Sequence, residues 1–122
     1  MTDTTTFYDE DVGDAVNRWT PDNASEGIEF KLVKRDGQMY KGFIVEEVKS
    51  GKKTGNMIKV RYFFLQIGKE VKECKFGPQS MEKWIAKHGK EVIKWANKIG
   101  VITHGKVNER KYIIAIPKGT LD

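Results

Sequence analysis

Lys59, Arg61 and Phe63 alternate along one short segment of the chain. Successive side chains of an extended strand point to opposite faces of a sheet, so these three would share one face. Two cations beside an aromatic ring suit a ligand that carries both negative charge and flat rings. We therefore predict that this face binds a ligand. The opposite face would be apolar core, formed by Ile58, Val60, Tyr62 and Phe64.

The partner strand follows a glycine turn, and the length of that turn decides which side chains join the predicted binding face. A three-residue loop, 68–70, places Lys75 on the binding face and Phe76 on the apolar face. A two-residue loop, Gly68-Lys69, reverses the partner strand and places Phe76 beside Arg61. The three-residue loop keeps one face uniformly apolar, so we predict that register.

Two further pairs of cations lie in predicted loops. Lys52 and Lys53 belong to a glycine-bounded loop, 50–56, and Lys106 and Arg110 flank the loop between the last two predicted strands. Loops at the rim of a binding face can contact phosphates, and solvation is the alternative role of such side chains. The candidate nucleic-acid-binding residues are therefore Lys52, Lys53, Lys59, Arg61, Phe63, Lys75, Lys106 and Arg110.

Charge is distributed unevenly along the chain. Residues 1–26 contain seven acidic residues and one arginine, a net charge of −6, whereas the whole chain carries +5. The remaining residues therefore carry +11, and the sequence pI is about 9.3. A body with this excess of positive charge attracts polyanions. A lysine-rich solvated surface is the alternative explanation of the same composition.

Hydrophobic periodicity predicts several strands and one helix. Apolar residues recur at helical spacing from Met81 to His88, and Gly89 follows as a C-terminal cap. The segment 90–98 also fits helical spacing, and its structure is left open. Asp36-Gly37 predicts a two-residue β-hairpin, and Gly42 predicts a bend or bulge in the strand that follows. The predicted strands cover 28–35, 38–49, 58–67, 71–76, 99–105 and 111–117.

This order of elements resembles the oligonucleotide/oligosaccharide-binding (OB) fold, a five-stranded barrel found in many single-strand-binding proteins. The resemblance covers about residues 27–117 and rests on Gly42, the hairpin at Gly68, the helix SMEKWIAKH and the segment WANKIGVI. It implies a mainly β, OB-like barrel with one helix between barrel strands 3 and 4, to which the strand at 28–35 is additional. It also implies that barrel strands 2 and 3 form the ligand face, and that the loops after strands 1 and 4 form its rims.

The 122 residues suffice for one domain with its own core. We expect residues 27–122 to form the barrel. Residues 1–26 lack periodicity, so we expect a flexible acidic arm whose aromatic residues dock on the barrel or on a protein partner. The sequence has no apolar run of transmembrane length, and its acidic N-terminus argues against a signal peptide. A single cysteine, Cys74, suits a reducing interior, so we expect a cytoplasmic protein.

The sequence offers little for catalysis. Its two histidines and one cysteine fall on different predicted elements without zinc-ligand spacing, and it lacks phosphate-loop, hydrolase and metalloprotease motifs. We therefore expect neither an enzyme nor a cofactor or metal site. The prediction is a module that binds single-stranded nucleic acid, DNA in preference to RNA, with little sequence specificity. The alternative is a protein-interaction adaptor that uses the barrel face or the acidic arm.

Overall fold

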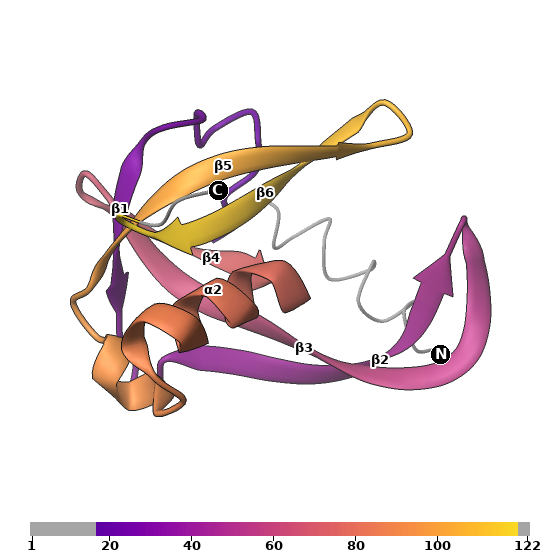
Figure 1. Cartoon of the computed structure of the whole chain (residues 1–122), viewed down its shortest axis with the longest axis horizontal. Coiled ribbons are helices and arrows are strands. Elements are labelled where there is room, and N and C mark those ends of the chain that lie inside the picture. The colour runs from indigo at the N-terminus through magenta and orange to yellow at the C-terminus, as the bar shows by residue number, and fades with distance from the viewer. Residues whose placement is uncertain (1–16, 120–122) are drawn as a thin grey trace.

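A computed structural model describes residues 17–119 of the chain. In this range the protein is mainly β, with six antiparallel strands, one α-helix and one 3-10 helix (Figure 1). Neither helix of the described range is long and apolar enough to cross a bilayer. The elements in chain order are β1 (Glu29–Val33), β2 (Tyr40–Lys49), β3 (Lys52–Ile67), β4 (Glu70–Phe76), α2 (Pro78–His88), η2 (Val92–Trp95), β5 (Ile99–Val107) and β6 (Arg110–Pro117).

The long strand β3 organises the sheet. β4 pairs with one of its edges, and β2 and β1 pair in succession with the other. Tyr40 of β2 lies opposite Phe63, and Val33 of β1 lies opposite the next residue, Phe64. β1 also pairs with β5, which pairs with β6. β1 and β2 therefore act as one interrupted strand along β3, and no ladder joins β4 to β6 within the described chain.

Two predictions rested on glycine residues, the turn at Asp36-Gly37 and the bend or bulge at Gly42. Asp36 and Gly37 both have positive φ, 53° and 77°, and form the predicted turn. The predicted hairpin is wrong, because β1 and β2 pair with β3 and, apart from an isolated bridge between Arg35 and Gln38, not with each other. Gly42 pairs regularly with β3, and the sheet irregularity falls between Glu46 and Val48. The predicted bend at Gly42 is therefore misplaced by several residues.

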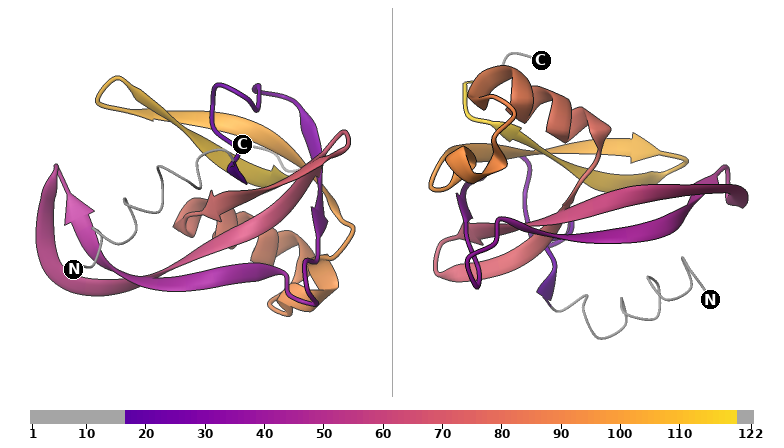
Figure 2. Two further views of the ribbon diagram at one scale, coloured as in Figure 1. Left: turned by 180° about the vertical axis from the view of Figure 1, so that it is seen from behind. Right: turned by 90° about the horizontal axis from the view of Figure 1, so that it is seen from below.

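The main core lies between the curved sheet and the two helices (Figures 1 and 2). Trp84 of α2 and Trp95 of η2 are fully buried, and their ring centroids lie 5.6 Å apart. Phe63 stacks on Trp95 at 5.7 Å and on Phe76 at 4.2 Å. Large aromatic side chains contribute most of the apolar area that such a small core can bury. The aliphatic and smaller residues of the core include Leu32, Leu65, Cys74, Ile102 and Ala115.

Local sequence explains the limits of α2. Pro78 lies in the first turn, where a missing backbone N–H has no intrahelical acceptor to lose. Gly89 follows the last helical residue with φ of 87°, and its N–H donates to the carbonyl of Ile85. The predicted helix and its glycine cap are confirmed. The ambiguous segment that follows contains the short 3-10 helix η2.

The turn between β3 and β4 has two residues, so the three-residue register predicted from the sequence is wrong. Ile67 lies opposite Glu70, which leaves Gly68-Lys69 as the loop. Gly68 has φ of 63°, as such a tight turn requires. Phe63 therefore lies opposite Cys74. Lys75 lies on the opposite face from Phe63, because a shift of one residue exchanges the two faces of a strand.

Phe63 is a core residue, contrary to the predicted exposed position. Its side chain is 0% exposed, because η2 and β4 cover the face of β3 that was expected to bind a ligand. On the other face, Val60 and Tyr62 are also buried, at 5% and 2%, in a smaller cluster with Val45 and Phe43. Both faces of β3 are therefore apolar at this point. Alternation alone could not identify the inner face.

Residues 17–26 pack against the sheet, so the expected arm is too long at its C-terminal end. Trp19 is 7% exposed and its Nε1 donates to the carbonyl of Leu65 at 2.8 Å. Ala24 is fully buried, and its carbonyl lies 2.8 Å from His104 Nε2, which donates to it. Residues 1–16, with the remainder of the expected arm, lie outside the described residues.

Replacement of Phe63 with alanine should lower the free energy of unfolding by about 3–5 kcal/mol, as expected for a buried aromatic residue. Ile44→Ala is a matched control, since Ile44 is 62% exposed on the same face of the β2–β3 hairpin. The control should change stability by less than about 0.5 kcal/mol. Urea unfolding measures both variants. If both variants lost the same small amount of unfolding free energy, Phe63 would have to be a surface residue.

Candidate nucleic-acid interface

A cavity of about 700 Å³ lies between the facing edges of β4 and β6. Residues 73–75 of β4 form one wall and residues 111–114 of β6 form the opposite wall. The segment 18–21 and the start of α2 close the remaining sides. We call this space the β4–β6 cavity. It is larger than two other cavities, of about 530 Å³ and about 290 Å³, and it lies where the sheet lacks a ladder.

The cavity exists because α2 takes the place of a strand beside part of β6. Ser80 Oγ accepts a hydrogen bond from the N–H of Ala115 at 3.2 Å, and Trp84 Nε1 donates to the Ala115 carbonyl at 3.1 Å. These two backbone groups point away from β5, toward the unpaired edge of β6. On such an edge the backbone groups would otherwise be free to pair with another strand. β6 starts at Arg110, before the part of the strand that the helix covers. The helix therefore seals one end of the gap and leaves the rest open.

Arg18, Tyr62 and Lys75 bring two cations and an aromatic ring to one wall of the cavity. The guanidinium carbon of Arg18 lies 4.4 Å from the centroid of the Tyr62 ring. Tyr62 lies opposite Lys75 in the ladder between β3 and β4. All three residues line the cavity. This is the combination of charge and aromatic surface that the sequence analysis placed around Phe63, but it is built on the other face of β3.

The electrostatics of the cavity favour an anion. Burial lowers the pKa of Lys75, and the nearby charge of Arg18 lowers it further. Both causes disfavour the protonated lysine, and an anion bound beside Lys75 and Arg18 would offset them. The acidic residue of the lining, Glu73, is 5% exposed and forms an ion pair with Lys41 at 2.7 Å. Lys111 on the β6 wall adds a further cation to the lining.

Tyr112 supplies the exposed aromatic surface of the cavity. It is 42% exposed, whereas Trp19 and Tyr62, which also line the cavity, are nearly covered. Gly105 lies opposite Tyr112 in the β5–β6 ladder. A Cβ atom at Gly105 would lie 2.4 Å from Cζ of the tyrosine, so the ring occupies the space that the glycine leaves. The packing against Gly105 fixes the position of the ring.

The four predicted loop cations lie at or beside the tips of two hairpins. The predicted loop 50–56 is too long, because the turn is Ser50-Gly51 and Lys52 and Lys53 are the first residues of β3. Lys106 and Arg110 flank the turn between β5 and β6. Both turns contain two residues with positive φ, which suits the twist of a hairpin. The two hairpins project to the same side of the molecule (Figures 1 and 2).

Lys59 and Arg61 do not join the cavity. They lie on the face of β3 that carries Phe63, beyond the part that the core covers. The Arg61 guanidinium lies 5.7 Å from the ring of Tyr40. Lys59 lines a separate cavity of about 530 Å³ beside η2. Of the predicted strand residues, Lys75 alone lines the β4–β6 cavity.

Sequence reasoning missed Arg18, Tyr62, Lys111 and Tyr112. Arg18 was placed in a flexible arm, and Tyr62 was placed in the core. The two-residue turn at Gly68-Lys69 would have joined Tyr62 to Lys75, so the choice of register hid that pair. The available signal for the β6 wall was a predicted strand that begins with Lys111 and Tyr112, after a strand that ends in Gly105.

Known proteins add nothing to this geometry. No family model, no curated protein and no solved structure matches the chain. In residues 17–119, no group of three or more histidine, cysteine, aspartate or glutamate residues is placed to hold a metal ion.

Replacement of Arg18 with glutamine should raise the pKa of Lys75, because it removes one of the two causes of the depression. The pKa should remain below that of a solvated lysine, since burial persists. NMR titration of isotopically labelled lysine side chains measures the change. Arg35→Gln is the matched control, because Arg35 lies over Phe64 and not over Tyr62. An unchanged Lys75 pKa in Arg18→Gln would contradict the proximity of the two charges.

Proposed function

We propose that this protein binds single-stranded nucleic acid, with the β4–β6 cavity as the centre of the binding surface. The observation that carries the proposal is the convergence of Arg18, Tyr62, Lys75, Lys111 and Tyr112 on one cavity. Single strands are held by positive charge along the backbone and by aromatic rings that stack on unpaired bases. The cavity offers both on rigid strands. The described residues carry 22 basic and 11 acidic residues, which favours long-range attraction of a polyanion.

The proposed fold is an OB-like barrel that remains open between β4 and β6. β1 and β2 together would be its first strand, since both pair with one edge of β3 and β1 also pairs with β5. β3 and β4 would then be barrel strands 2 and 3, which form the ligand face of such barrels. Tyr62 and Lys75 lie on these two strands. The hairpin tips that carry Lys52, Lys53, Lys106 and Arg110 would be the rims of the face.

We expect single strands to bind more tightly than duplex, with weak sequence preference. Stacking on Tyr112 requires a base whose face is free, and a duplex buries that face. The helix of the described chain packs against β6 and the core, so it is not presented as a groove-reading element. DNA is the proposed strand. Stacking and phosphate contacts also operate on RNA, so the assay compares both.

A protein-interaction module is the second candidate. Ile44 and Met57 are 62% and 59% exposed on neighbouring positions of one face of the β2–β3 hairpin. Exposed aliphatic side chains grouped in this way favour a protein partner. This face is opposite the one that carries Tyr62. Substitutions at the two faces therefore distinguish the two functions.

Lys75→Gln and Lys111→Gln should each weaken binding of a labelled oligonucleotide of about 16 nucleotides. Each should also reduce the slope of log K against log salt by about 0.7, the value for one phosphate contact on a single strand. Fluorescence anisotropy at several salt concentrations measures both effects. Lys90→Gln, beyond the far end of α2, should change neither quantity.

Lys59→Gln compares the two faces of β3 in the same assay. A larger effect of Lys59→Gln than of Lys75→Gln would place the interface on the opposite face. Equal or tighter binding of duplex at matched salt would contradict the proposed function.

Tyr112→Ala should weaken binding by about 1–3 kcal/mol if a base stacks on the ring. Tyr112→Phe is the control, because it keeps the aromatic surface and should keep most of the affinity. The urea unfolding midpoint of both variants separates a loss of stacking from a loss of structure. Equal affinity of the alanine variant and the parent protein would remove Tyr112 from the interface.

A further inference from the structure

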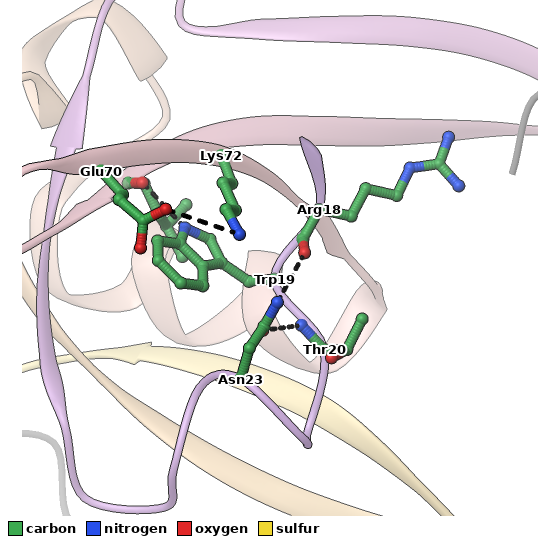
Figure 3. Close-up of polar contacts among 7 residues, drawn as sticks. Arg18, Trp19, Thr20, Asn23, Glu70 and Lys72 are labelled. Carbon is green, nitrogen blue, oxygen red and sulfur yellow. Dashed lines mark hydrogen bonds and ion pairs between the residues drawn. The ribbon is translucent and has the colours of Figure 1, made fainter. Parts of the chain in front are cut away.

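The chain enters the described structure beside the β4–β6 cavity, and its entry point is firmly held (Figure 3). Arg18 forms a parallel bridge with Glu73 of β4, and the N–H of Trp19 donates to the Glu73 carbonyl at 2.8 Å. Asn23 closes a turn over this segment, since its side chain bonds to the N–H of Thr20 and to the carbonyl of Arg18. Residues 1–16 are therefore tethered at the edge of the proposed binding surface.

The composition of residues 1–16 is complementary to that surface. The segment has no lysine or arginine, and its acidic residues are Asp3, Asp9, Glu10, Asp11 and Asp14. The cavity lining carries Arg18, Lys75 and Lys111. Carboxylates form the same charge-assisted hydrogen bonds with such cations that phosphates form. The acidic segment thus resembles the proposed ligand in charge.

The segment also matches the apolar part of the surface. Tyr112 at the cavity is 42% exposed, and Phe43, on the same face of the β2–β3 hairpin as Tyr62, is partly exposed. Phe7 and Tyr8 are adjacent to the acidic run and offer rings of the kind that nucleobases offer. A peptide that combines carboxylates with aromatic rings can therefore occupy both the charged and the apolar parts of the binding surface.

Reach and local concentration favour this intramolecular occupant. A chain spans at most about 3.3–3.6 Å per residue, so 16 residues extend to roughly 50 Å. A segment tethered by a short connection experiences an effective concentration in the millimolar range at a nearby site. Even weak contacts are then occupied for a large fraction of the time.

We propose that residues 1–16 bind the β4–β6 cavity as an intramolecular competitor of nucleic acid. This inference rests on the proposed function for its consequence, because the segment and the strand would occupy one surface. A strand must displace the segment before it binds. Short strands, which make few contacts, are therefore excluded more strongly than long ones.

The decisive variant neutralises the acidic run in the full-length chain, with Asp9→Asn, Glu10→Gln and Asp11→Asn. Its matched control removes the same charge elsewhere, with Asp36→Asn, Glu82→Gln and Glu91→Gln. Without nucleic acid, the arm variant should shift the amide NMR signals of Tyr62, Lys75 and Lys111, and the control should leave them unchanged. This measurement tests occupancy of the surface independently of any nucleic-acid binding.

Oligonucleotide affinity then tests competition. The arm variant should bind a single-stranded oligonucleotide about tenfold more tightly than the parent chain at 0.05 M salt, as expected for loss of a tethered competitor. The difference should shrink as salt rises, because the screening length falls from about 10 Å at 0.1 M to about 3 Å at 1 M. Equal tightening in the arm and control variants would attribute the effect to net charge and overturn the proposal.

The two readouts keep failure of this proposal separate from failure of the proposed function. Unshifted signals of Tyr62, Lys75 and Lys111 in the arm variant would overturn intramolecular binding, whatever the oligonucleotide result. Shifted signals without nucleic-acid binding by any variant would support the intramolecular contact and reject the proposed ligand.

Discussion

The backbone of Ala115 is the point on which the architecture depends. Its N–H and carbonyl face away from β5, and the helix side chains of Ser80 and Trp84 bond to both. A buried strand edge must find such partners, because an unsatisfied backbone group costs about 1–3 kcal/mol. The helix meets this requirement without a sixth ladder. It thereby leaves β4 and β6 apart and creates the cavity beside its own first turn.

β3 carries the second constraint, because it serves two surfaces at once. Its inner face contributes Phe63 to a core closed by the two helices, and its outer face contributes Tyr62 to a cluster beside the cavity. β1 and β2 share one edge of the strand, and β4 takes the other. In its central part, β3 is therefore paired along both edges and packed on both faces. Rigid support of this kind limits the motion of Tyr62 and Lys75, which a preorganised binding surface needs.

The charged residues of the β4–β6 cavity are also arranged in a way that favours an anion. The buried acid of the cavity lining, Glu73, is paired with Lys41, and an unpaired carboxylate at that position would be costly. Burial lowers the pKa of Lys75, and the charge of Arg18 lowers it further. A positive site next to low-dielectric aromatic rings gains most from an anion, because water screens the interaction less there. The cavity is therefore better suited to phosphate or carboxylate than the solvated lysines elsewhere on the surface.

Local patterns in the sequence determined the mainly β class, the helix from Met81 to His88 and the Asp36-Gly37 turn. Each depends on neighbouring residues, whose spacing or φ preference is written locally. The inner face of β3 and the position of Phe63 were decided by the tertiary structure, because both faces of that strand are apolar. The position of Trp19 depends on a hydrogen bond from its Nε1 to the carbonyl of Leu65, 46 residues away in the chain. The candidate interface could not be read from the sequence for the same reason. Its cations and rings come from Arg18, β3, β4 and β6, and the packing of α2 against β6 holds them around one cavity.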